Sequence, residues 1–138
     1  MTICDLEYSW NYNHADISKA AGSQINPNPH SDPFNDTNHG TAVIGVLVAD
    51  NNGWGTTGIC YNAGLKTCAT YYNSAWNVPV AISYAIAALP AGDIILLEPQ
   101  WPYTAGGTDY IPVEWWTDSA PAGQSYNACY AAIVTAVA

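Results

Sequence analysis

One apolar segment headed by a histidine constrains the fold of this chain more than any other feature. Residues 41–49, TAVIGVLVA, directly follow Asn38-His39-Gly40 and contain no charged side chain. A helix with one face in water carries polar residues on that face, so this pattern predicts a helix over Thr41–Ala49 that is buried all round. Residues 20–38 are rich in Gly, Ser, Asn, Pro and Asp, and predict an exposed connection before the helix.

Three short apolar runs predict the strands of a sheet. They are Thr2–Cys4, which stops at Asp5, Leu65–Thr70, and Asp93–Leu97. The continuous apolar run of the third is typical of a parallel strand covered on both faces. Helical patterns over Pro79–Leu89 and Ala128–Val137 alternate with these strands. We therefore predict an α/β fold with a parallel sheet flanked by helices.

Composition limits the classes of function. The 138 residues are 49% hydrophobic and 9% charged, and eleven acidic residues against two basic ones give a formal net charge of −9. The chain is long enough for one core, and its composition excludes disorder. An acidic surface repels phosphate backbones and anionic lipid, so we expect no nucleic acid and no membrane as partners. The first ten residues, MTICDLEYSW, lack the basic and apolar regions of a signal peptide.

The four cysteines show no metal-binding pattern. Cys4, Cys60, Cys68 and Cys129 form no CxxC pair. Their apolar neighbours favour buried thiols, whereas secretion would favour disulfides, for which four cysteines allow three pairings.

Asp5 and His39 are the first candidates for chemistry. In a parallel α/β sheet, functional groups collect at the carboxyl ends of strands and the amino ends of helices, which is where these two residues are predicted to lie. An aspartate that accepts a hydrogen bond from one imidazole nitrogen leaves the other nitrogen free as a base. The alternative is that Asp5 is a turn residue and His39 only begins a helix.

Two segments carry a family resemblance. HGTAVIGVLVADNNGWGTTGI closely resembles the histidine motif of the subtilisin-like serine peptidases (subtilases), and ICDLEYSWNYNHADI is similar to their aspartate motif, in the family's order. PAGDIILLEPQ and YNACYAAIVTAVA resemble the family's next core strand and a later helix. The resemblance implies a subtilisin-like fold, with His39 as the catalytic base and Asp5 as the acid that orients it. We expect their side chains roughly 2.6–3.2 Å apart, with Gly40 and Thr41 allowing a close approach of the helix start.

The chain also departs from the family. It contains neither a Gly-Thr-Ser motif for the nucleophilic serine nor the preceding oxyanion asparagine segment. The resemblance therefore implies that residues 1–138 are the amino-terminal portion of a peptidase domain, which alone hydrolyses no peptide. Its expected partners are a polypeptide substrate in the complete domain, and the missing carboxyl-terminal half or further copies of itself. Most of the family is secreted.

Residues after the third predicted strand stand where subtilases bind their substrate. Glu98, Gln100 and Trp101 occupy this position, and Pro99 removes one backbone donor there, which alters strand-like pairing with a peptide. Glu98 either caps a neighbouring backbone, or adds negative charge near His39, or selects basic substrate side chains.

The resemblance further implies a structural calcium ion, Ca2+. Calcium binds carboxylate, amide and carbonyl oxygens in flexible geometry. The positions that match the family's site are Asp16 and Asn52, with the carbonyl groups of Asp50, Trp54 and Thr56. The alternative is a plain Asn-Gly turn.

Two other functions remain open. One is a non-catalytic half-domain that buries its open sheet edge against another copy or a companion chain. The other is a metal-dependent hydrolase that uses Asp5, His39 and Glu98, which is disfavoured because only one of these ligands is a histidine.

Overall fold

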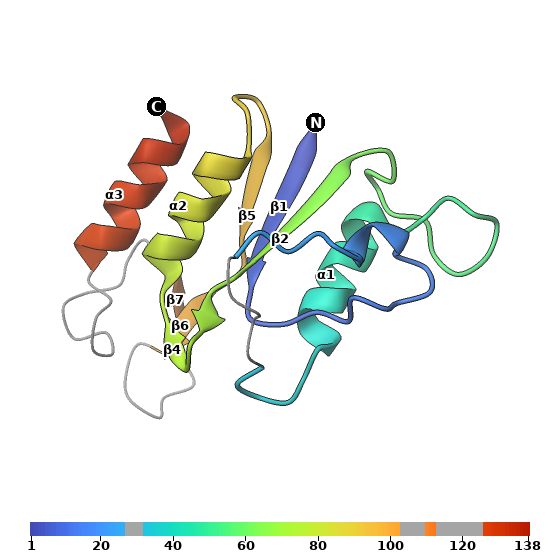
Figure 1. The fold of residues 1–138 in the computed structure, drawn as a ribbon, viewed down its shortest axis with the longest axis horizontal. Coiled ribbons are helices and arrows are strands. Elements are labelled where there is room, and N and C mark those ends of the chain that lie inside the picture. Colours follow the sequence, from blue (N-terminus) through green and yellow to red (C-terminus); the bar gives the residue numbers. More distant parts are fainter. Residues whose placement is uncertain (27–31, 103–109, 113–125) are drawn as a thin grey trace.

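The computed structural model describes residues 1–26, 32–102, 110–112 and 126–138. For residues 101, 102, 110–112, 126 and 127 it describes the backbone alone. Its centre is a parallel sheet in the order β2-β1-β5 (Figure 1). Strand β1 spans Thr2–Glu7, β2 spans Gly64–Ala69 and β5 spans Ile94–Leu97. In the middle strand, Asp5 lies opposite Thr67 on one side and Leu96 on the other.

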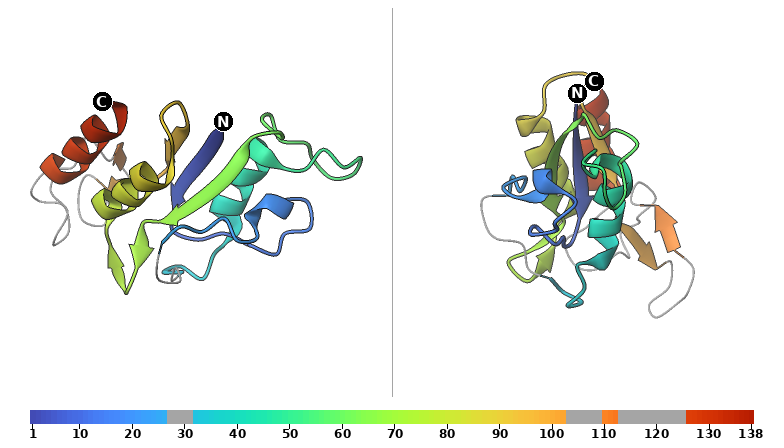
Figure 2. Two further views of the ribbon diagram at one scale, coloured as in Figure 1. Left: turned by 45° about the horizontal axis from the view of Figure 1, so that its top comes forward. Right: turned by 90° about the vertical axis from the view of Figure 1, so that its right-hand side faces the viewer.

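Helices cover both faces of this sheet. Helix α1 (Asn38–Val48) lies on one side and α2 (Val78–Ala88) lies on the other (Figures 1 and 2). Helix α3 (Tyr126–Val137) packs against α2. Two core clusters follow from this arrangement, because successive side chains of a strand point to opposite faces. Ile3 packs in the cluster that contains α1, and Cys4 packs in the cluster that contains α2. The predicted α/β fold with a parallel sheet flanked by helices is confirmed.

Strand β1 is longer than its sequence pattern indicates. We expected it to stop at Asp5, but it continues to Glu7, and Asp5 pairs with neighbours in the middle of the sheet. A buried strand accepts this aspartate because the indole Nε1–H of Trp10 donates to its Oδ2 over 2.8 Å. Because side chains alternate along a strand, Asp5 and Glu7 face α1 on the same side of β1 as Ile3.

Helix α1 is not buried all round, and this expectation was wrong. It begins at Asn38, and its buried residues are Gly40, Ile44 and Val48, whereas Val46 on the outer side is 61% exposed. Helix α1 packs on one face of the sheet, and that contact buries only one side of it.

The prediction that β5 is covered on both faces is confirmed in part, because Leu96 packs against the cluster on the α1 side and Ile95 and Leu97 pack against the cluster on the α2 side. Among the described residues β5 pairs only with β1, so it forms one edge of the sheet, and Ile94 is 42% exposed. The opposite edge, β2, is covered by the segment before α1. Ser23 and Ile25 exchange backbone hydrogen bonds with Thr67, and the Asn26 side chain bonds both the N–H and the carbonyl group of Ala69. Part of the expected exposed connection is therefore buried.

The remaining elements are short. They are the 3-10 helix η1 (Ser18–Ala20), a hairpin of β3 (Tyr71–Tyr72) and β4 (Ala75–Trp76), and a hairpin of β6 (Gln100–Pro102) and β7 (Tyr110–Pro112). The first hairpin turns through Asn73 and Ser74, which both have positive φ, as a two-residue turn between twisted strands requires. Sequence reasoning predicted neither pair of strands, and the turn between β3 and β4 carries no Asn-Gly pair.

All four cysteines are free, and Cys4, Cys68 and Cys129 are buried, as their apolar neighbours predict. No helix in the described part of the chain is long and apolar enough to cross a membrane.

Candidate functional site

His39 pairs with Glu7. The imidazole Nδ1 lies 2.6 Å from Oε1 of Glu7, whose other oxygen accepts the backbone N–H of Tyr8 over 3.1 Å. Only 4% of the Glu7 side chain is exposed, against 53% of the His39 side chain. The pair therefore joins a buried carboxylate at the end of β1 to a half-exposed imidazole in the first turn of α1.

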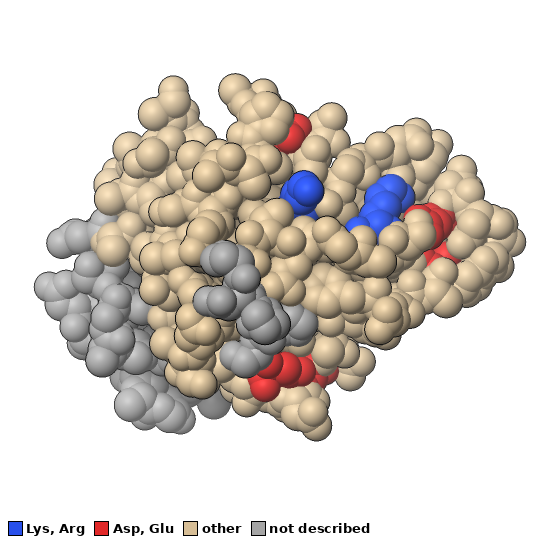
Figure 3. Space-filling view, viewed as in Figure 1, with Lys and Arg blue, Asp and Glu red and all other residues tan. Residues whose placement is uncertain are grey.

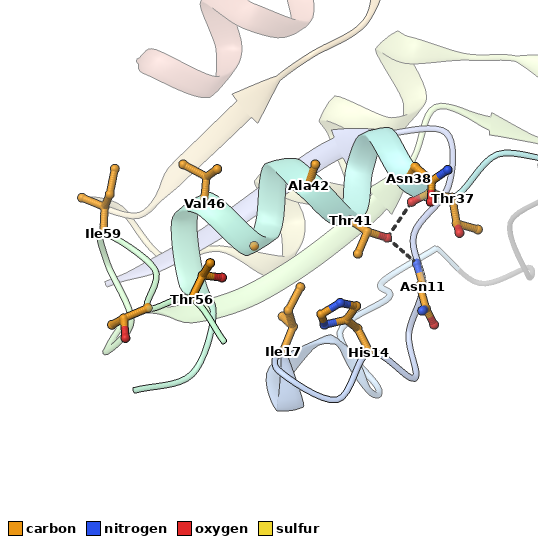
Figure 4. A pocket seen from close by; sticks show the side chains of 12 residues that line it. Asn11, His14, Ile17, Thr37, Asn38, Thr41, Ala42, Val46, Thr56 and Ile59 are labelled. Carbon is orange, nitrogen blue, oxygen red and sulfur yellow. Dashed lines mark hydrogen bonds between the residues drawn. The ribbon is translucent and has the colours of Figure 1, made fainter. Parts of the chain in front are cut away.

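Gly40 allows this close approach. A Cβ atom at this position would clash with the carbonyl oxygen of Ser9 and would lie 2.9 Å from the indole ring of Trp10. Thr41 adds a second tie, because its Oγ1 accepts the backbone N–H of Asn11 over 2.8 Å (Figure 4). The expectation that Gly40 and Thr41 bring the helix start close to the strand is confirmed.

Asp5 does not make the expected hydrogen bond with His39. One of its carboxylate oxygens accepts from Trp10, and the other, Oδ1, is buried without a hydrogen-bond partner. The physical reason is position along β1. Asp5 and Glu7 share the face toward α1, but Glu7 lies two residues, about 7 Å, closer to the start of that helix. Sequence reasoning missed Glu7 because it ended the strand at Asp5; alternation from Ile3 through a longer strand would have found it.

Burial sets the electrostatics of these two carboxyl groups. It raises the pKa of Asp5 to about 7, with further increases from the negative charges of Glu7 and Glu98, while the Trp10 hydrogen bond opposes the shift. Burial also raises the pKa of Glu7, and the charge of His39 opposes that shift.

Glu98 lies beside the pair. One ligand atom from each of Glu7, His39 and Glu98 lies within 4.8 Å of the other two. The backbone N–H of Glu98 continues the sheet by donating to the Leu6 carbonyl over 3.4 Å, which carries Glu98 to the edge where β1 ends. Of the three roles left open for Glu98, the structure supports negative charge near His39.

The other two residues expected to bind substrate, Gln100 and Trp101, lie in β6. Gln100 is exposed at the start of β6, and Trp101 follows it in the same strand, with its side chain outside the described residues.

Aromatic rings flank the histidine. The Tyr8 ring stacks on the His39 ring, with centroids 6.5 Å apart and planes at 25°. Phe34 and Trp76 pack against the same tyrosine, with centroid distances of 5.1 Å and 6.4 Å, and Phe34 is 62% exposed. The imidazole therefore has an apolar wall on one side and carboxylates on another.

The loop expected to bind calcium is closed by hydrogen bonds. Asp16 accepts the Asn52 side-chain N–H over 2.9 Å and the Thr56 backbone N–H over 2.8 Å, while Asn52 Oδ1 accepts the Trp54 backbone N–H over 3.1 Å. The residues do converge, but their side-chain oxygens already accept N–H groups.

Asp50 is also engaged. It accepts hydrogen bonds from Ser18 and lies 3.2 Å from the ammonium group of Lys19. This donor set, with a cation already at Asp50, does not fit a calcium ion as arranged, and calcium binding stays a prediction of the resemblance.

A groove lies elsewhere on the molecule. It has a volume of about 530 Å³ between α1 and the loops around Asn11 and Thr56, with Ala42 and Val46 along its wall (Figure 4). None of Glu7, His39 and Glu98 lines it.

Charged groups are sparse on the face drawn in Figure 3, where most of the surface is neither acidic nor basic. The chain contains two residues of Lys or Arg type, Lys19 and Lys66, so few side chains can offset the negative charge of Glu7 and Glu98.

Comparisons of the chain with models of protein families, with curated proteins and with solved structures give no match. The function therefore has to be argued from the geometry. A buried carboxylate that orients an accessible imidazole is an arrangement suited to general base catalysis.

Asp5 predicts a dependence of stability on pH. The folded chain keeps the Asp5 proton up to about pH 7, while the unfolded chain loses it near the ordinary value of 3.8. The unfolded state then binds fewer protons between these values, so the free energy of unfolding falls as pH rises through this window. Asp5→Asn mimics the protonated form, and we expect it to stabilise the fold at about pH 8, by at most about 4 kcal/mol.

Urea unfolding at about pH 5 and about pH 8 measures this effect. Asp50→Asn is the matched control. The pKa of Asp50 is lowered, first by the hydrogen bond from the Ser18 backbone. Asp50→Asn should therefore lower the free energy of unfolding at neutral pH, and this variant should still show the fall in that free energy between about pH 5 and about pH 8 that Asp5 causes. An Asp5→Asn variant less stable than the wild type at about pH 8 would contradict the account of Asp5.

Proposed function

We propose that the chain is part of a subtilisin-like serine endopeptidase domain, in which His39 is the general base and Glu7, rather than Asp5, orients it. The observation that carries the proposal is the 2.6 Å contact between His39 Nδ1 and Glu7 Oε1, made by the histidine of the family-like motif. The parallel sheet with helices on both faces supports the same assignment, as does the close approach of strand and helix at Gly40.

The pair supports one defined proton transfer. Nδ1–H donates to Glu7, so the neutral ring keeps its lone pair on Nε2, which is the nitrogen that can accept the proton of a serine hydroxyl. That serine would come from sequence other than these residues, because they contain no Gly-Thr-Ser motif. When the imidazolium forms, the Glu7 carboxylate stabilises its charge, and the low exposure of Glu7 strengthens this interaction. The oxygen of the serine then attacks the peptide carbonyl carbon, and the proton on Nε2 passes to the leaving amine.

Peptide hydrolysis by the natural polypeptide that contains this chain tests the proposal. We expect Glu7→Gln to lower kcat by roughly 10⁴-fold, because it loses the tautomer, and His39→Ala to lower kcat by roughly 10⁶-fold, because it loses the base. Asp5→Asn should retain most of the activity, since Asp5 contacts Trp10. The 138 residues alone should show no turnover.

His14→Ala is the matched histidine control, because His14 Nδ1 accepts only a local bond from the Asp16 backbone. Full activity of Glu7→Gln together with an inactive Asp5→Asn would contradict the assignment of the acid. Turnover by the chain alone that His39→Ala abolishes would contradict the role of an external serine.

A second candidate function is a non-catalytic half-domain that associates with further copies of itself or with a companion chain. The observation that favours it is an apolar stripe on α3, where Tyr130, Val134 and Val137 are 51%, 45% and 80% exposed at helical spacing. The partly exposed edge strand β5 adds backbone groups that could pair with another strand.

Light scattering across a dilution series tests association. Burial of several hundred Å² of apolar surface favours association by roughly 25 cal/mol per Å². This free energy opposes the repulsion between chains of net charge −9. We expect a mass that rises with concentration, and a smaller rise for Val134→Asp. Ser83→Asp, on an exposed position of α2, is the control. A monodisperse monomer at high concentration would contradict this candidate.

A further inference from the structure

Glu7, His39 and Glu98 form a cluster of three potential metal ligands. Glu7, His39 and Glu98 come from three separate segments, the end of β1, the start of α1 and the residue after β5, and their ligand atoms lie within 4.8 Å of one another. Glu7 is buried, Glu98 is half-buried and His39 is exposed, so the cluster is open to solvent on one side.

The negative charge of the cluster lacks a basic partner. Of the two lysines, Lys19 lies 3.2 Å from Asp50. Lys66 follows Leu65 on β2, and because Leu65 packs in the cluster on the α1 side, Lys66 lies on the opposite face of the sheet. Two carboxylates beside one imidazole therefore have no Lys or Arg to offset them.

A third carboxyl group, Asp5, lies next to the cluster along β1. Asp5 is on the same face of β1 as Glu7, is fully buried, and leaves Oδ1 without a hydrogen-bond partner. A buried carboxylate oxygen without a hydrogen-bond partner, next along the strand to an acidic cluster that no Lys or Arg offsets, adds to the case for a bound cation.

We propose that Glu7, His39 and Glu98 bind a divalent transition-metal ion such as Zn²⁺. One imidazole nitrogen and two carboxylate oxygens are ligands that zinc accepts, and the exposed side leaves a position for water. Imidazole favours zinc over magnesium or calcium. Ligand atoms around tetrahedral zinc lie about 3.3 Å apart, so the side chains need to shift by about 1 Å. If the ion takes Nδ1, the proton there passes to solvent and the bond between His39 and Glu7 is replaced by two bonds to the metal.

One consequence rests on the proposed function. A metal held by His39 and Glu7 disrupts the pairing that orients the base, so Zn²⁺ would inhibit the peptidase.

Calorimetric titration of the metal-free chain with Zn²⁺ tests the site without any turnover. We expect about one ion per chain, about tenfold or more weaker binding in Glu98→Gln, and no measurable binding in His39→Ala. His14→Ala and Cys60→Ser are the matched controls and should bind as the wild type does, because the His14 ring accepts a local bond from the Asp16 backbone and, like the half-buried Cys60 thiol, lies outside the cluster.

A second measurement needs no variant. Co²⁺ added to the wild-type chain should broaden the ring NMR signals of His39 before those of His14. Absence of Zn²⁺ binding, unchanged affinity in both Glu98→Gln and His39→Ala, or earlier broadening of His14 would overturn the proposal. Failure here leaves the peptidase proposal standing, because the readout is binding alone, and loss of the peptidase proposal leaves a measured metal site standing.

Discussion

The hydrogen bond between His39 and Glu7 depends on one close contact, the approach of the α1 start to the end of β1. Gly40 makes the contact possible, because any side chain there would meet the Ser9 carbonyl and the Trp10 ring. The same Trp10 ring donates to Asp5, so one tryptophan serves both the packing of the helix and the satisfaction of a buried carboxyl group. The loop after β1, which contains Ser9 and Trp10, thus connects the core with the polar groups around His39.

Burial of acidic groups is the energetic cost of the arrangement. Asp5 and Glu7 lie on one face of a central strand, and burial raises the pKa of both. Only one cationic partner is near them, and it is an imidazole. An unpaired buried charge is expensive, and proteins hold such groups where chemistry or ligand binding needs them. The stability lost through Asp5 at neutral pH therefore belongs to the same arrangement that pairs buried Glu7 with an accessible imidazole.

Much of the fold follows from the sequence. The apolar runs predict β1, β2 and β5 and the helices between them, and Pro79 stands in the first turn of α2 as expected. What the sequence could not supply was the length of β1, because a charged residue such as Asp5 ordinarily ends a buried strand. The partner that keeps it inside, Trp10, lies beyond the strand and is brought back by a turn. The identity of the acid follows from that length, so the error at Asp5 and the omission of Glu7 have one cause. Glu98 was predicted to lie near His39 only as one of three alternatives, since its position depends on the parallel pairing of β5 with β1.

The proton on His39 Nδ1 tests the central pairing most directly. Nitrogen-detected NMR of the imidazole in the 138-residue chain reports which ring nitrogen carries the proton and whether it is hydrogen-bonded, which the positions of heavy atoms leave to inference. The account predicts a protonated Nδ1 with a strongly downfield proton, lost in Glu7→Ala and retained in Asp5→Asn. A downfield Nδ1 proton that survives Glu7→Ala and disappears in Asp5→Asn would contradict it.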